Sequence, residues 1–123
     1  MSSPPDTRDL LDPSQIEFLV SLDDGQGEIL AEIVREYLAS SEECSSELGR
    51  LLGEGDCQAI ERTAHTLKGA SANVGASGLA EVCARLELGA RERQLGDAAD
   101  LMEQLVEELD RVRAALQAAT ATV

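Results

Sequence analysis

Apolar residues recur at helical spacing through most of this 123-residue chain. Between residues 27 and 52 they alternate in steps of four and three, which is the spacing of one face of an α-helix. The apolar or small residues of this face are Leu30, Val34, Tyr37, Ser41, Cys44, Leu48 and Leu51. The same kind of pattern predicts further helices over 13–22, 57–74, 77–93 and 98–118. Strands are not expected, because no run of β-branched residues alternates with period two. The pattern therefore predicts an all-α protein.

Short breaks that contain glycine separate these helices and indicate how they are arranged. The breaks near Gly53, Gly75 and Gly96 exclude one long coiled coil. Gly53 is placed to end the helix before it, and Asp56 and Ser77 are placed to cap the two helices that follow. Connections this short favour antiparallel neighbours. We therefore predict an antiparallel up-down four-helix bundle with a short extra N-terminal helix. The predicted division is a flexible lead-in over 1–11, the helical bundle over 12–118 and a frayed tail over 119–123.

The composition excludes several classes of partner. Ten Lys and Arg residues stand against 24 Asp and Glu, which gives a net charge of −14, and aromatic residues make up only 2% of the chain. Binding to nucleic acids relies on basic grooves and aromatic stacking, so no nucleic-acid partner is expected. No stretch approaches the roughly 18 apolar residues of a membrane span, and the N-terminus lacks the pattern of a signal peptide. Cys44, Cys57 and Cys83 form no C-x-x-C pair and are expected to be reduced. The expectation is a cytoplasmic monomer with no membrane partner.

His65 is the only histidine, and it lies on the helix predicted over 57–74. At 100° per residue it points away from the buried stripe that includes Ile60 and Leu67. Lys68, the only lysine, follows one turn later. Gly69 is unexpected inside a helix, where glycine costs about 1 kcal/mol relative to alanine. Two explanations fit Gly69: close approach by another molecule beside His65, or close packing of a neighbouring helix.

An exposed imidazole beside a cation and a small residue is suited to nucleophilic attack on a phosphoryl group. Neutral imidazole is a good nucleophile near pH 7. Lys68 is placed to neutralise the transferred phosphate, and Arg62 is a weaker second candidate. Glu61 could orient the imidazole, although a solvated surface charge is the favoured interpretation for it. Lone surface histidines are common, so spacing alone favours an ordinary exposed residue as the interpretation of His65.

The segment Ala64–Ala76, AHTLKGASANVGA, resembles the signature of histidine-containing phosphotransfer (HPt) domains. The resemblance extends over residues 20–118 and includes Leu86 and Glu87 in the following helix. It implies a four-helix bundle that carries phosphate on His65. Lys68 would neutralise the charge of the phosphate, and Gly69 would be the small residue that leaves His65 accessible. Some family members place a Gln from the following helix near the histidine, and this sequence offers no secure counterpart for it.

The resemblance implies a free-standing, bacterial-type phosphorelay intermediate of a two-component system. It would accept phosphate on His65 from the receiver domain of a hybrid histidine kinase and pass it to the receiver of a response regulator. The sequence contains no Gly-rich nucleotide loop, so a phosphocarrier without autokinase activity is expected. No cofactor or metal site is expected, and any Mg²⁺ would belong to the receiver. The alternative is a phosphate-independent adaptor that binds a protein partner; a hydrolytic or metal enzyme has little support from one histidine.

Overall fold

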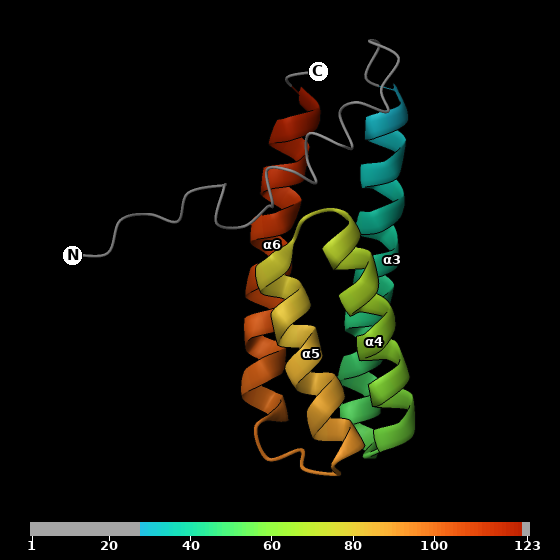
Figure 1. Ribbon diagram of the computed structural model, residues 1–123, viewed down its shortest axis with the longest axis vertical. Helices are drawn as coiled ribbons and strands as arrows, with labels where there is room; N and C mark the ends of the chain where they lie inside the picture. The colour runs from blue at the N-terminus through green and yellow to red at the C-terminus, as the bar shows by residue number, and fades with distance from the viewer. Residues whose placement is uncertain (1–27, 122–123) are drawn as a thin grey trace, which may run out of the picture.

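The computed structural model describes residues 28–121, and every regular element among these residues is an α-helix. The helices are α3 (Glu28–Glu54), α4 (Cys57–Asn73), α5 (Ser77–Arg91) and α6 (Ala98–Ala121). They run alternately up and down (Figure 1). The predicted all-α, antiparallel four-helix bundle is confirmed. The helix predicted over 13–22 and the lead-in over 1–11 lie outside the described residues, and α6 ends three residues beyond its predicted end.

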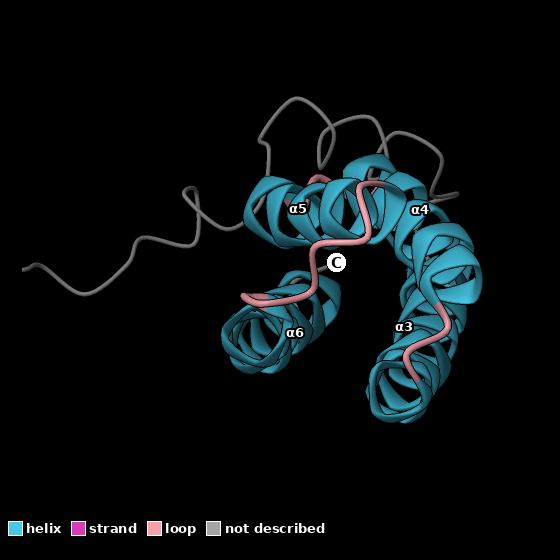
Figure 2. Ribbon diagram, turned by 90° about the horizontal axis from the view of Figure 1, so that it is seen from below, coloured by secondary structure: helices cyan, strands magenta, loops and turns pink. Residues whose placement is uncertain are grey.

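Each of the four helices packs against two others. The contacts join α3 to α4, α4 to α5, α5 to α6 and α6 back to α3. The end-on view shows α4 and α5 side by side, with α3 and α6 on the other side of the bundle (Figure 2). The α4–α5 pair is the shorter hairpin, and α3 and α6 extend past the turn that joins α4 to α5 (Figure 1). Both α4 and α5 have one face buried in the bundle and one face exposed to solvent.

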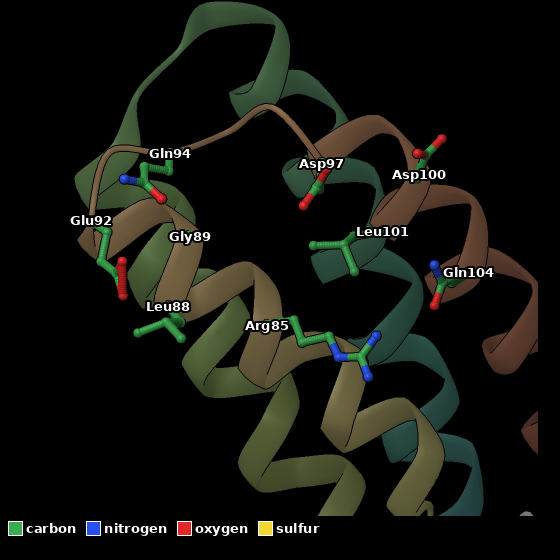
Figure 3. A pocket seen from close by; sticks show the side chains of 9 residues that line it. All are labelled: Arg85, Leu88, Gly89, Glu92, Gln94, Asp97, Asp100, Leu101 and Gln104. Carbon is green, nitrogen blue, oxygen red and sulfur yellow. The ribbon is translucent and has the colours of Figure 1, made fainter.

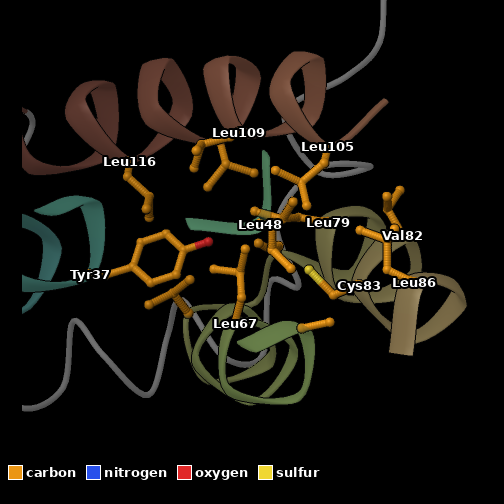
Figure 4. Packing of buried hydrophobic residues seen from close by; sticks show 14 of the residues in the cluster. Tyr37, Leu48, Leu67, Leu79, Val82, Cys83, Leu86, Leu105, Leu109 and Leu116 are labelled. Atoms are coloured by element: carbon orange, nitrogen blue, oxygen red, sulfur yellow. The ribbon is translucent and has the colours of Figure 1, made fainter. Parts of the chain in front are cut away.

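Leucines from all four helices form a large part of the core (Figure 4). Its largest fully buried side chains are Leu48, Ile60, Leu67, Leu79, Leu86, Leu105, Leu116, Val112, Cys83, Ser41 and Ser71. All three cysteines are free thiols; Cys83 is buried, whereas Cys44 and Cys57 are only partly buried. Burial raises the pKa of the Cys83 thiol to about 12. This thiol stays protonated at neutral pH and packs as a small apolar group.

A buried polar contact joins α3 to α4. The hydroxyl groups of Tyr37 and Ser71 are 2.9 Å apart inside the bundle. Burial also raises the pKa of Tyr37 to about 12, so its hydroxyl remains protonated and available as a donor. Because a buried hydroxyl without a partner is unfavourable, this bond favours one rotation of α4 relative to α3. That rotation determines which side chains of α4 face solvent.

The turn between α3 and α4 differs in one residue from the prediction. Asp56 caps α4 as predicted, because its Oδ1 accepts a hydrogen bond from the backbone N–H of Ala59 at 3.2 Å. The prediction that Gly53 ends α3 is wrong: the helix continues to Glu54, and Gly55 takes the left-handed conformation with φ of 71°. Glycine adopts this conformation without the steric cost that a Cβ brings.

The turn between α4 and α5 contains Gly75, which has φ of 80°. The N–H of Ala76 donates to the carbonyl of Ser71 at 2.8 Å, which satisfies one carbonyl of the last turn of α4. The prediction that Ser77 caps α5 is wrong, because the N-cap position is occupied by Ala76 and Ser77 is already helical. The tight reversal at Gly75 places α5 antiparallel to α4, so residues late in α5 lie beside residues early in α4.

Candidate phosphoacceptor site

His65 lies on the solvent side of α4, as predicted. Its side chain is 67% exposed, whereas Ile60 and Leu67 on the opposite side of the helix are almost fully buried. Helical geometry separates His65 from that buried stripe, so the imidazole does not take part in the core. The ring is therefore accessible to another molecule.

Glu87 of α5 holds the imidazole in place from the neighbouring helix. Its Oε2 lies 2.8 Å from Nδ1 of His65, and its Oε1 lies 2.6 Å from Nζ of Lys68. The Glu87 side chain is only 7% exposed, in contrast to the histidine that it contacts. One carboxylate thus binds both residues that the sequence motif singled out, and it holds the ammonium group beside the ring.

The charge state of Glu87 determines which histidine nitrogen is free. The hydrogen bond from Lys68 lowers the pKa of the Glu87 carboxyl below its usual value; burial acts in the opposite direction, and the bond to His65 lowers the pKa further. Glu87 is therefore ionised at neutral pH and can only accept hydrogen bonds. The neutral imidazole that faces it carries its proton on Nδ1, which leaves the lone pair on Nε2.

Arg91 completes the group from the next turn of α5. Its Nε donates to Oε1 of Glu61 at 2.9 Å, and its Nη2 donates to Oε2 of Glu87 at 3.2 Å. Glu61 is therefore paired with Arg91, and the carboxylate that binds the imidazole is Glu87. Glu61 is thus an ion-paired surface charge, which is closer to the interpretation that the sequence favoured for it than to an orienting role. With Lys68 and Arg91, two cations compensate the charge of the buried Glu87 carboxylate.

Gly69 faces open space one turn after His65. A Cβ atom built on Gly69 would meet nothing within 4 Å. Close packing of a neighbouring helix, one of the two explanations offered for this glycine, is therefore wrong. The structure leaves room beside His65 that nothing within the described part of the chain fills.

The comparisons with known proteins agree with this geometry. The family model described as the Hpt domain matches residues 32–115, which is more than half of the chain. The chain belongs to the Hpt domain family. The crystal structure of histidine-containing phosphotransfer protein B (HptB) from Pseudomonas aeruginosa PAO1 is similar, with 32% sequence identity, a TM-score of 0.85 and 99% of each chain covered.

A second similar structure supports the fold alone. It is a histidine-containing phosphotransfer protein from rice, with 20% identity and a TM-score of 0.81, and the match covers 94% of this chain and 82% of that one. The search of curated proteins found no match. Together, the family match and the HptB likeness support a role in histidine phosphotransfer for this Hpt domain.

The surroundings of His65 in this Hpt domain form a shallow depression rather than a deep pocket. The residues that line it are Glu61, Arg62, His65, Thr66, Glu87 and Arg91. A separate pocket lies between α5 and α6 near the loop that joins them, lined among others by Arg85, Leu88 and Asp97 (Figure 3). No residue of the His65–Lys68–Glu87 group lines that pocket. A shallow surface of this kind suits a protein partner better than an enclosed small molecule.

Residues 28–121 contain no candidate metal site and no candidate membrane-spanning helix. No group of three or more His, Cys, Asp or Glu side chains in this range could hold a metal ion. None of the four described helices is long and apolar enough to cross a membrane.

Glu87 is the site residue whose contact with His65 the sequence reasoning missed. The sequence does contain an indication of this contact. Glu87 lies four residues after Cys83 and three before Ala90, on the buried side of α5. An acidic residue at such a position needs a partner, since burying an unpaired charge is unfavourable. In this chain, the residue of the following helix that contacts the histidine is Glu87.

Proposed function

We propose that this Hpt domain is a phosphorelay intermediate. Nε2 of His65 accepts a phosphoryl group from the aspartyl phosphate of one receiver domain and passes it to the aspartate of a second. The observation that carries this proposal is the exposed imidazole whose Nδ1 is bound by the buried, ionised Glu87. In a two-component system the first receiver would belong to a hybrid histidine kinase and the second to a response regulator.

The forward step is an in-line displacement at phosphorus. The lone pair of Nε2 forms the new N–P bond while the bond between phosphorus and the aspartyl oxygen breaks, and the aspartate leaves as a carboxylate with the electron pair. The ring then carries a positive charge, with its proton still on Nδ1. Glu87 stabilises this charge through the 2.8 Å hydrogen bond, as the buried aspartate of a Ser-His-Asp triad does for its histidine.

Lys68 supplies the compensating charge for the phosphate. Its ammonium binds the same carboxylate as the imidazole, so it is held beside the ring before the phosphate arrives. When the phosphoryl group is attached, Lys68 can exchange its bond with Glu87 for a bond with a phosphate oxygen. Arg91 still binds Glu87 after this exchange, so the carboxylate keeps one cationic partner. Transfer of a phosphoryl group depends mainly on such positioning and charge compensation.

In this proposal the domain is a carrier without autokinase activity. It needs no cofactor of its own, and Mg²⁺ acts only in the receiver. Gly69 leaves the space through which the receiver approaches. The cytoplasm is the proposed compartment, with which three free thiols are consistent.

Transfer from loaded receivers tests the proposal. Purified receiver domains from the same organism are loaded with labelled phosphate on their aspartate and mixed with this domain. The expected result is loss of label from at least one receiver and its appearance on this chain, but not on a His65→Gln variant. If no loaded receiver transfers its phosphate, and a partner binds equally well to the wild type and to His65→Gln, the chain is a phosphate-independent adaptor instead.

A further inference from the structure

Charge is distributed unevenly over the described helices. The α4 and α5 helices, which form the site, together carry four basic and three acidic residues. The other described residues carry five basic and fifteen acidic residues. Among the described helices, the α4–α5 hairpin with His65 therefore carries slightly more basic than acidic residues, whereas α3 and α6 each carry an excess of acidic residues. Such a difference produces a more positive potential at that face than at the surfaces of α3 and α6.

Every acidic side chain on this hairpin has a basic partner. The pairs are Glu61 with Arg91 at 2.9 Å, Glu81 with Arg85 at 3.1 Å and Glu87 with Lys68 at 2.6 Å. These pairs use three of the four basic residues and leave Arg62. Among residues 28–121, Arg62 has no ion-pair partner. The most available positive charge on the hairpin is thus Arg62.

The position of Arg62 directs this charge toward a molecule that approaches His65. It is exposed, it precedes His65 by one helical turn, and it lines the same shallow depression. Its side chain is not needed for the core or for the Glu87 group. Its guanidinium can therefore form a new bidentate bond with a carboxylate of a partner without breaking an existing one.

We infer that Arg62 is a docking residue that binds the acidic rim around the phosphoaspartate of a receiver domain. The inference rests on the proposed function and specifies its partner surface. A receiver that donates or accepts phosphate through an aspartate presents anionic groups at the point of contact. Arg62 attracts those groups to the His65 face, while the acidic surfaces of α3 and α6 disfavour other orientations. At physiological ionic strength the Debye length is about 8 Å, so a charge at the contact acts far more strongly than charges on the opposite side of the bundle.

Two charge reversals with the same effect on net charge test this inference. Arg62→Glu changes the proposed docking residue, and Arg35→Glu is the matched control. Arg35 is also exposed and also has no ion pair among the described residues, but it lies on α3, which carries none of the site residues. Both variants are checked for helical content by circular dichroism. The measurement is the rate of transfer from the loaded receiver that reacts fastest with the wild type, over a range of receiver concentrations.

We expect Arg62→Glu to lower kcat/KM by about 10-fold while the rate at saturating receiver stays within about 2-fold of the wild type, because charges at an interface mainly affect association. Arg35→Glu is expected to change kcat/KM by less than about 2-fold. In 1 M salt, where the Debye length is about 3 Å, the difference between the two variants should shrink.

Three results would overturn the inference while leaving the proposed function intact. An equal decrease in kcat/KM for Arg62→Glu and Arg35→Glu would mean that only the net charge of the domain matters. An unchanged kcat/KM for Arg62→Glu would mean that no anionic surface meets Arg62. A loss confined to the saturating rate would place Arg62 in the chemical step. If the wild type itself takes no phosphate from any loaded receiver, the proposed function fails, and the inference fails with it.

Discussion

Nδ1 of His65 and Oε2 of Glu87 are 2.8 Å apart, although the two residues are separated by 22 positions in the chain and belong to different helices. The histidine is exposed and the glutamate is buried, so the contact connects the surface of α4 to the interior of the α4–α5 hairpin. It orients the ring and keeps a negative charge next to Nδ1. The contact leaves Nε2 free, and Nε2 is the atom that reacts in the proposed transfer.

Glu87→Gln should slow phosphoryl transfer by about 10-fold, which corresponds to 1.4 kcal/mol in the activation free energy. The amide oxygen can still accept the hydrogen bond from Nδ1, but it carries no charge to stabilise the imidazolium that forms. Single-turnover transfer from a loaded receiver measures the rate. Nitrogen NMR of the single histidine shows whether Nδ1 still carries the proton. An unchanged rate with the same tautomer would show that the charge of Glu87 is not used.

Lys68→Ala should slow transfer by about 10-fold without abolishing it, because the ammonium compensates charge and does not form a bond to phosphorus. The phosphorylated form should also hydrolyse faster. Lys68→Arg is the control, since it keeps the positive charge and should recover most of the rate. The role assigned to Lys68 is wrong if the alanine variant transfers as fast as the wild type.

Gly69→Ala should increase the free energy of unfolding by up to about 1 kcal/mol, since alanine is the better helix former and its Cβ meets nothing within 4 Å. Transfer from a receiver should nevertheless become slower, and more so for Gly69→Gln, because each larger side chain occupies space that the receiver needs. Urea denaturation and transfer kinetics measure the two effects. Phosphorylation by the small donor phosphoramidate is the control and should change little. Full activity of Gly69→Gln with the receiver would exclude a steric role.

Acid should destabilise the wild type more steeply than Glu87→Gln. The pKa of Glu87 is lower in the folded protein than its ordinary value of 4.5, so the unfolded state binds more protons between these two values. The stability that Glu87 contributes is complete above about pH 4.5 and is lost as the pH falls through the folded pKa. Urea denaturation at a series of pH values from 7 to 3 gives the slope of the unfolding free energy against pH for each of the two proteins. Parallel slopes below pH 4.5 would show that Glu87 is not ionised more readily in the folded state.

Most of the fold could be predicted because its cause is local. The apolar steps of four and three in α3 and the leucines of α6 identify both the helices and their buried faces, and short connections favour antiparallel order. The caps were harder to predict. Asp56 was correct, but Gly53 and Ser77 were each placed at a helix end that the structure puts one or two residues away. Gly53 and Gly55 are equally suited to end a helix, so pattern alone does not distinguish them. At the start of α5 the N-cap position falls on Ala76, which forms no side-chain capping bond, so capping preference gave the wrong residue.

The site could be predicted only where it lies on one helix. His65, Lys68 and Gly69 share α4, and their spacing is visible in the sequence. The contact with Glu87 depends on the rotation and register of α5 against α4, which the core packing and the turn at Gly75 determine together. Similarly, the pairing of Glu61 with Arg91 joins residues 30 positions apart. Contacts between helices require three-dimensional information that helical spacing does not contain.

The most direct test of the central claim is the intact mass of the domain, measured under alkaline conditions after mixing with a phosphorylated receiver. Because His65 is the only histidine, the number and position of phosphohistidines are read from one protein and one variant. The account predicts that the wild type gains one acid-labile phosphate and that His65→Gln gains none while keeping its helical content. A phosphate on His65→Gln, or an unchanged wild-type mass with receivers shown to be loaded, would contradict it.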